Sequence, residues 1–155
     1  MASQETKSRA VEEKVKVADF KNRSRNFDNE IELRKQAIED IQDIEIDSTI
    51  GNESSLTIQK QNYKIGNAYY LQKDFDSAKA YLEKSIDEAS EKNDLVVAKD
   101  AKRKLSEVYS SSGEYDKALE TYKEYTDLVE ALYIKKEQEI IQAARFSKEI
   151  AEKQN

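Results

Sequence analysis

Three aromatic and polar residues between positions 63 and 70 are placed to bind a ligand. Tyr63, Asn67 and Tyr70 are spaced i, i+4 and i+7, so on a helix they share one face. The asparagine amide offers both donors and an acceptor to the backbone of an extended peptide, and the tyrosines would lie on either side of it. The pattern predicts a peptide-binding surface. The alternative is that both tyrosines simply pack between neighbouring helices.

The same spacing occurs twice more in the chain. Val15, Asp19 and Asn22 precede the central set, and Arg103, Glu107 and Ser110 follow it. If the three helices stack side by side, their matching faces form one groove, in which an arginine can bind a carboxylate. The predicted peptide or partner site comprises Asp19, Asn22, Tyr63, Asn67, Tyr70, Arg103 and Glu107.

The composition argues against catalysis and against metal or cofactor binding. The chain has neither cysteine nor histidine, which removes thiolate and imidazole ligands and the usual nucleophile and general-base pairs. The acidic stretch after Glu39 resembles a calcium loop starting at Asp43. Its sixth and twelfth positions, however, are Ser48 and Ser54, where glycine and glutamate are needed. We therefore expect no enzyme, no cofactor and no metal site.

The chain contains an internal repeat, which explains the recurring stripe. Tyr63 to Ala89 returns as a degenerate copy from Arg103 to Val129, forty residues later, and a weaker first copy begins near Val17. In the first copy Glu30 stands where Ala78 stands in the second. A period of this size predicts stacked helical hairpins.

Composition also indicates a thin, nearly all-helical core. Leu, Ile, Val and Phe make up 33 of 155 residues, close to the roughly 20% below which disorder becomes the default. Proline is absent and glycine occurs only three times.

The net charge is −6 and no basic face is evident, so nucleic acid is not an expected partner. No apolar run is long enough to span a membrane, and we expect no membrane contact by this segment itself.

Helix signals divide the chain into one helical-repeat domain, residues 1–155. We expect hairpins at about 4–46, 55–92 and 95–133, and a C-terminal helix extension at 134–155. The one clear loop is Asp47 to Ser55, and Gly113 should end the fifth helix in a left-handed cap. Beyond residue 114 the pattern allows one very long helix or two with a bend near Lys135 to Gln138.

The middle copies resemble tetratricopeptide repeats. The family pattern of a large residue, a small one and Tyr, then a turn, an aromatic and Ala, stands here as Ile65, Gly66, Tyr69, Lys73, Phe75 and Ala78, and again as Leu105, Ser106, Tyr109, Gly113, Tyr115 and Ala118. The opening Trp and the terminal Pro are missing, and the period is 40 instead of 34. The resemblance covers roughly residues 11 to 155. It implies an all-α, right-handed solenoid of tetratricopeptide-like hairpins with a long C-terminal helix.

The long period and the unbroken tail are similar to the sensor region of bacterial tetratricopeptide sensor histidine kinases. This likeness implies a non-catalytic module that binds a protein or peptide in its concave groove, within a bacterial signalling protein. The alternative is a structural module that forms a homodimer through the C-terminal helix. The compartment is open: cytoplasmic for the chain as given, periplasmic for a sensor-kinase ectodomain.

Overall fold

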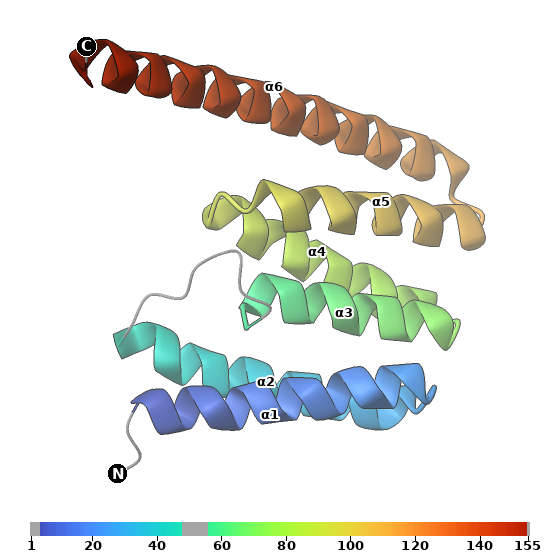
Figure 1. The fold of residues 1–155 in the computed structure, drawn as a ribbon. Coiled ribbons are helices and arrows are strands. Elements are labelled where there is room, and N and C mark those ends of the chain that lie inside the picture. The colour runs from blue at the N-terminus through green and yellow to red at the C-terminus, as the bar shows by residue number, and fades with distance from the viewer. Residues whose placement is uncertain (1–3, 48–55, 155) are drawn as a thin grey trace.

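The protein is all-α, as the sequence predicts. A computed structural model describes residues 4–47 and 56–154 (Figure 1), and the predicted loop lies outside these residues except for Asp47, which ends a helix. Within the described residues the order is α1 (Gln4–Arg23), α2 (Phe27–Asp47), α3 (Ile58–Leu71), α4 (Phe75–Glu91), α5 (Leu95–Ser111) and α6 (Tyr115–Gln154).

One type of turn joins four of the helix pairs. After α1, α3, α4 and α5 a single residue takes a positive φ: Arg25, Lys73, Asn93 and Gly113. The next residue then donates its backbone N–H to the carbonyl five positions back, as from Glu114 to Tyr109. This is the hydrogen bond of a Schellman cap. Gly113 adopts the predicted left-handed conformation, and three non-glycine residues adopt it as well.

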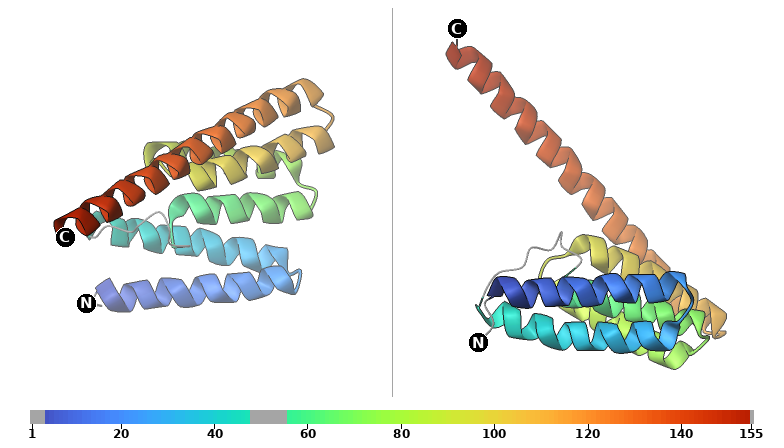
Figure 2. Two further views of the ribbon diagram at one scale, coloured as in Figure 1. Left: turned by 45° about the horizontal axis from the view of Figure 1, so that its top comes forward. Right: turned by 60° about the horizontal axis from the view of Figure 1, so that its bottom comes forward.

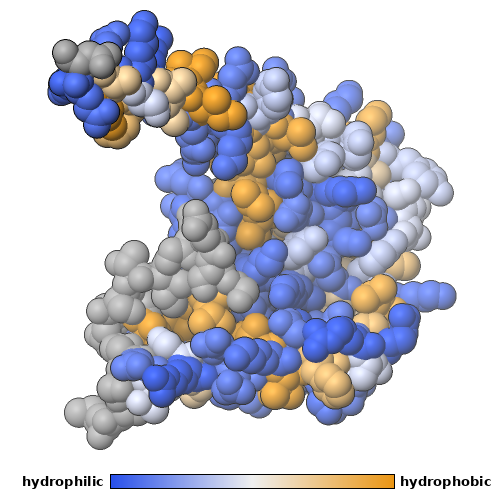
Figure 3. Space-filling view, viewed as in Figure 1, coloured by the Kyte–Doolittle hydropathy of each residue, from blue (hydrophilic) through white to orange (hydrophobic). Residues whose placement is uncertain are grey.

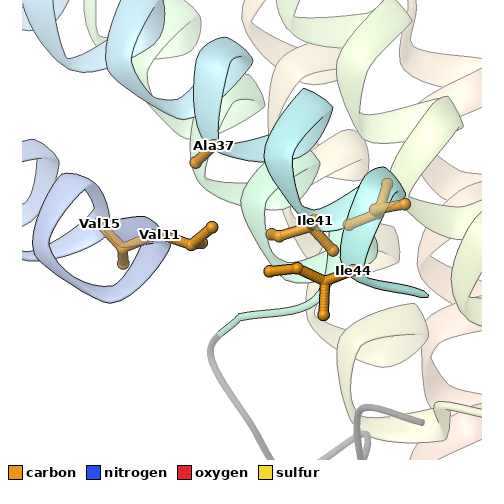
Figure 4. Packing of buried hydrophobic residues seen from close by; sticks show 6 residues of the cluster. Val11, Val15, Ala37, Ile41 and Ile44 are labelled. Atoms are coloured by element: carbon orange, nitrogen blue, oxygen red, sulfur yellow. The ribbon is translucent and has the colours of Figure 1, made fainter. Parts of the chain in front are cut away.

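Successive helices pack against one another and build a stack (Figure 1). In the first hairpin, Val11 and Val15 of α1 face Ala37, Ile41 and Ile44 of α2 (Figure 4). Val15 is therefore a core residue, and its expected place on the groove stripe is wrong, because its side chain closes the α1–α2 interface.

Small residues bring the helices of the middle and last hairpins close together. A Cβ atom on Gly66 would lie 2.7 Å from Cγ of Leu82 on α4, nearer than side chains tolerate, so α3 and α4 can only be this close with glycine at position 66. In the last hairpin Ser106 stands in this position, and its Oγ donates to the carbonyl of Ala118 at 2.8 Å. The small residues of the repeat pattern thus serve packing.

The C-terminal region is one continuous helix, and not two helices with a bend near Lys135 to Gln138. Helix α6 runs for 40 residues, and its second half leaves the other helices and projects away from them (Figure 2). The surface is hollowed beneath this projecting end (Figure 3). None of the described helices combines the length and apolar character that crossing a membrane requires.

Candidate functional site

A pocket of about 390 Å³ opens between α1, α2 and α3. Helices α1 and α3 supply its sides, and two buried residues of α2 supply its floor. The lining residues are Asp19, Asn22 and Arg23 of α1, Glu30 and Arg34 of α2, and Tyr63, Lys64 and Asn67 of α3.

The pocket brings together four of the seven predicted site residues. Asp19, Asn22, Tyr63 and Asn67 all line it, although α1 and α3 are separated in the sequence by α2. Two stripes on different helices thus meet as the stacking argument requires. Whether they bind a peptide stays a prediction.

The other three predicted residues lie elsewhere. Tyr70 packs on Phe75 with ring centroids 5.9 Å apart, and its hydroxyl shares a 3.0 Å hydrogen bond with Ser111 of α5. Glu107 accepts a hydrogen bond from Lys104, and Arg103 is exposed. For Tyr70 the packing alternative therefore fits better, because its ring packs on α4 and its hydroxyl hydrogen-bonds α5.

A charged network forms the floor of the pocket. The Arg34 side chain is 2% exposed and that of Glu30 is 0% exposed. Arg34 Nε donates to Glu30 Oε2 at 2.8 Å, Nη1 to Gln61 Oε1 at 2.9 Å and Nη2 to Asp19 Oδ1 at 2.8 Å. One guanidinium group therefore ties all three helices together.

The network is balanced in charge. Asn22 Nδ2 donates to the second oxygen of Glu30 at 3.0 Å, and Lys64 Nζ lies 3.3 Å from Asp19 Oδ1. Two carboxylates thus face one guanidinium and one ammonium group. Buried charges persist when they are paired and hydrogen-bonded in this way.

The pKa of Asp19 reflects these contacts. Burial acts to raise it, but the hydrogen bond from Arg34 and the positive charge of Lys64 outweigh burial, so the pKa lies below its usual value. Asp19 is therefore a carboxylate at neutral pH and accepts hydrogen bonds only.

Sequence reasoning missed the floor of the pocket, although a signal was present. Arg34 falls at helical spacing between Ile31, Ala37 and Ile41, inside an otherwise apolar stripe. Placing Glu30 opposite Ala78, as in the weaker first repeat, also places Arg34 opposite Leu82. Two charges at positions that are apolar in the next hairpin indicate a buried ion pair.

One polar atom in the pocket lacks a partner. Asn67 Oδ1 is buried and has no hydrogen-bond partner among the residues that the structure describes. Leaving a buried acceptor unpaired costs about 1–3 kcal/mol. A ligand that brings an N–H group to this position would remove that cost.

The described part of the chain contains no group of three or more acidic side chains that could hold a metal ion. The carboxylates of the pocket already accept hydrogen bonds from Arg34, Lys64 and Asn22. The arrangement is suited to hydrogen bonding with a polar ligand.

Comparison with known proteins identifies the repeat. Residues 56–131 match the family model described as tetratricopeptide repeat. A solved structure described as "Crystal structure of MamA" is similar at 23% identity and a TM-score of 0.47, and the match covers 81% of the present chain. The present chain spans 66% of the length of that solved chain. No curated protein matches.

The matched residues 56–131 comprise α3, α4, α5 and the first part of α6, which is the region that contains the close packing at Gly66. The chain is therefore an all-α helical-repeat protein whose residues 56–131 match the tetratricopeptide repeat family.

Proposed function

We propose that the protein is a non-catalytic interaction module that binds an extended peptide, free or as part of a partner protein, between α1 and α3. The observation that carries this proposal is the unpaired, buried Oδ1 atom of Asn67 at the pocket. A peptide N–H group is the donor that this acceptor lacks, and the ring of Tyr63 offers an apolar contact beside it.

The rim of the pocket suggests which peptides fit best. Both carboxylates of the floor are already bound by the network, whereas Arg23 is exposed and has no ion pair with any described residue. Lys64 has donors left after its contact with Asp19. An acidic side chain in the peptide would therefore be favoured.

A peptide library displayed against the purified chain tests the proposal. We expect enriched acidic peptides, and we expect Asn67→Ala to weaken their binding about tenfold, since one hydrogen bond contributes roughly 1–1.5 kcal/mol. Asn29→Ala is the matched control, because Asn29 is an exposed asparagine of α2 outside the pocket. Equal binding by both variants, or no enrichment at all, would contradict the proposal.

A role in a bacterial signalling protein, similar to the sensor region of a histidine kinase, is a further part of this proposal. It is supported by the forty-residue repeat read from the sequence and by the unbroken α6. Peptide binding would shift α1 against α3, and small shifts between stacked hairpins would change the direction of α6. The coding sequence on either side tests this, because it should encode a kinase or another output domain.

A second candidate function is self-association through the C-terminal helix. The observation that favours it is the exposure of large apolar side chains along α6, such as Tyr133, Ile140 and Phe146. Removing residues 134–155 should abolish a dimer in sedimentation equilibrium and leave peptide binding unchanged. A truncated chain that still dimerises would contradict this second function.

A further inference from the structure

One face of α6 carries a continuous stripe from end to end. At 100° per residue its positions lie within about 80° of one another, and every one of them is exposed. Apart from Glu137 the stripe has no charge. Its members are Tyr115, Leu119, Tyr122, Thr126, Val129, Tyr133, Glu137, Ile140, Ala144, Ser147 and Ala151.

The preceding hairpin shows what this face does in the fold. On α4 the positions forty residues earlier include Phe75, Leu82, Ile86 and Ala89, and these pack against α5. The stripe on α6 is therefore the face that receives a further helix in the stack. In the described chain α5 covers only the neighbouring face, through residues such as Leu128.

The amount of exposed surface favours an occupant. Tyr115, Tyr122 and Tyr133 are 69%, 49% and 70% exposed, which amounts to roughly 300–450 Å² per copy for these three side chains. That is about half of the ~800 Å² that each partner buries in an interface of standard size.

The opposite end of the stack is a less suitable occupant, although it exposes Phe20. The outer surface of α1 carries Glu5, Arg9, Glu12, Glu13 and Lys16, joined in pairs by ion pairs along the helix. Such a charged surface does not complement an apolar stripe, so head-to-tail stacking of copies is disfavoured. The complementary surface that remains is the same stripe on a second copy. Two copies that bind through the same surface form an isologous, two-fold dimer.

The stripe is symmetric about Tyr133. Its successive spacings are 4, 3, 4, 3, 4 and then 4, 3, 4, 3, 4 residues, so an antiparallel copy can place every member opposite another. Large residues then meet small ones. With Tyr133 opposite itself, the other pairs are Tyr115 with Ala151, Leu119 with Ser147, Tyr122 with Ala144, Thr126 with Ile140, and Val129 with Glu137.

Charge favours the antiparallel direction as well. Residues 115–132 carry five acidic and two basic side chains, a net charge of −3, and residues 134–154 carry four acidic and five basic side chains, a net charge of +1. An antiparallel pair sets the negative half against the positive half and brings Asp116 near Lys148. A parallel pair would set the two negative halves side by side.

We propose that α6 pairs with α6 of a second copy, antiparallel, about a two-fold axis at Tyr133. The projecting half of each helix then covers the stripe on the partner's first half, and the two helical stacks lie at opposite ends of the dimer. This inference rests on the self-association function and is independent of peptide binding.

Cysteine pairing tests the direction, because the chain has no cysteine of its own. Leu119→Cys and Ser147→Cys are made as separate single variants and are oxidised alone and as a mixture. We expect disulfide-linked dimers only in the mixture, since antiparallel pairing places each position opposite the other. Linkage of Leu119→Cys to itself would show parallel pairing and overturn the proposal, as would the absence of linkage in every sample.

Sedimentation equilibrium provides a second measurement that needs no cross-link. Tyr133→Glu places two like charges at the axis and should weaken the dimer at least tenfold, whereas Glu137→Leu should strengthen it. Gln138→Ala is the control, because Gln138 is exposed, uncharged and lies off the stripe. Circular dichroism verifies that each variant is helical. A chain that is monomeric at all concentrations would overturn the dimer. Asn67→Ala should leave dimerisation unchanged in the same assay, so the dimer proposal and the peptide-binding proposal can fail independently.

Discussion

At the scale of single residues, one glycine determines how closely two helices approach. Gly66 has φ and ψ typical of a helix, so the need for glycine at this position does not come from its conformational freedom. It comes from the absence of a Cβ atom. That atom would lie 2.7 Å from Cγ and 2.9 Å from Cδ2 of Leu82. The equivalent Ser106 keeps its Cβ, and the residue forty positions after Leu82 is the exposed Tyr122.

Gly66→Ala should therefore destabilise the protein. Overpacking costs about 1–3 kcal/mol, and the better helix propensity of alanine offsets about 0.5–1 kcal/mol of this. Urea denaturation should show a net loss of about 1–2 kcal/mol. In a Leu82→Ala background the clash is absent, so the same change should become neutral or stabilising. If the effect of Gly66→Ala were equal in both backgrounds, Leu82 would not be the cause.

A second residue, Glu114, joins three helices through its carboxylate. It accepts hydrogen bonds from Lys79 of α4, from Ser112 after α5 and from Lys117 of α6. The hydrogen bond from Lys79, followed by that from Ser112, lowers the pKa of Glu114 to about 2. Because the folded state favours the carboxylate, its contribution to stability is present above the ordinary pKa and is lost as the pH falls toward 2.

This shift can be measured directly. An NMR titration of the side-chain carboxyl carbon should give a pKa of about 2 for Glu114, and Lys79→Met should return the pKa toward its usual range. Lys136→Met, at an exposed lysine of the second half of α6, is the matched control. A pKa for Glu114 that Lys79→Met does not alter would contradict the role of Lys79.

At the scale of elements, the first hairpin is built differently from the second. Glu30 and Arg34 of α2 take the positions of Ala78 and Leu82 of α4, and ion pairs replace an apolar contact. Removing one partner of a buried ion pair typically costs 3–5 kcal/mol, whereas replacing the pair by apolar residues is often neutral or stabilising. The network can therefore be tested by comparing single and double changes.

Arg34→Met alone should lower the free energy of unfolding by about 3–5 kcal/mol, because Glu30 is left charged and buried. Glu30→Ala with Arg34→Met should restore most of it. Methionine is preferred to leucine, because Ala18 stands where Gly66 stands in the next hairpin and a branched side chain would be crowded. Thermal and urea denaturation give the values. A double variant as unstable as the single one would show that the charges themselves are required.

Sequence reasoning reached the helices and turns but only part of the pocket. Helix periodicity, Gly113 and the small residues at Gly66 and Ala118 depend on local spacing, which one sequence displays. The pairing of Arg34 with Asp19 depends on the distance between α1 and α2, which spacing along one helix does not contain. Tyr70 was placed in the predicted site for the same reason. Spacing along α3 does not reveal that the hydroxyl partner of Tyr70, Ser111, belongs to another hairpin.

At the scale of the whole molecule, stability is a sum of contacts between neighbouring helices. The apolar core consists of several small clusters, each spanning adjacent helices, as is typical of repeat proteins. The second half of α6 contributes to none of them, so its helix depends on its own hydrogen bonds or on a partner copy. A segment of this kind should open locally at a lower free energy than the stack.

Hydrogen exchange should therefore separate the two halves of α6 and reveal any partner copy. Residues 115–132 pack on α5 and should be protected at every protein concentration. Residues 134–154 form a helix of about six turns in which every side chain is exposed, and in proteins most helical stability comes from tertiary packing. Their amides should exchange rapidly in dilute protein and become at least tenfold slower as the antiparallel dimer forms. Tyr133→Glu should remove this concentration dependence and leave residues 115–132 protected, and slow exchange of 134–154 at all concentrations would mean that another contact covers the helix.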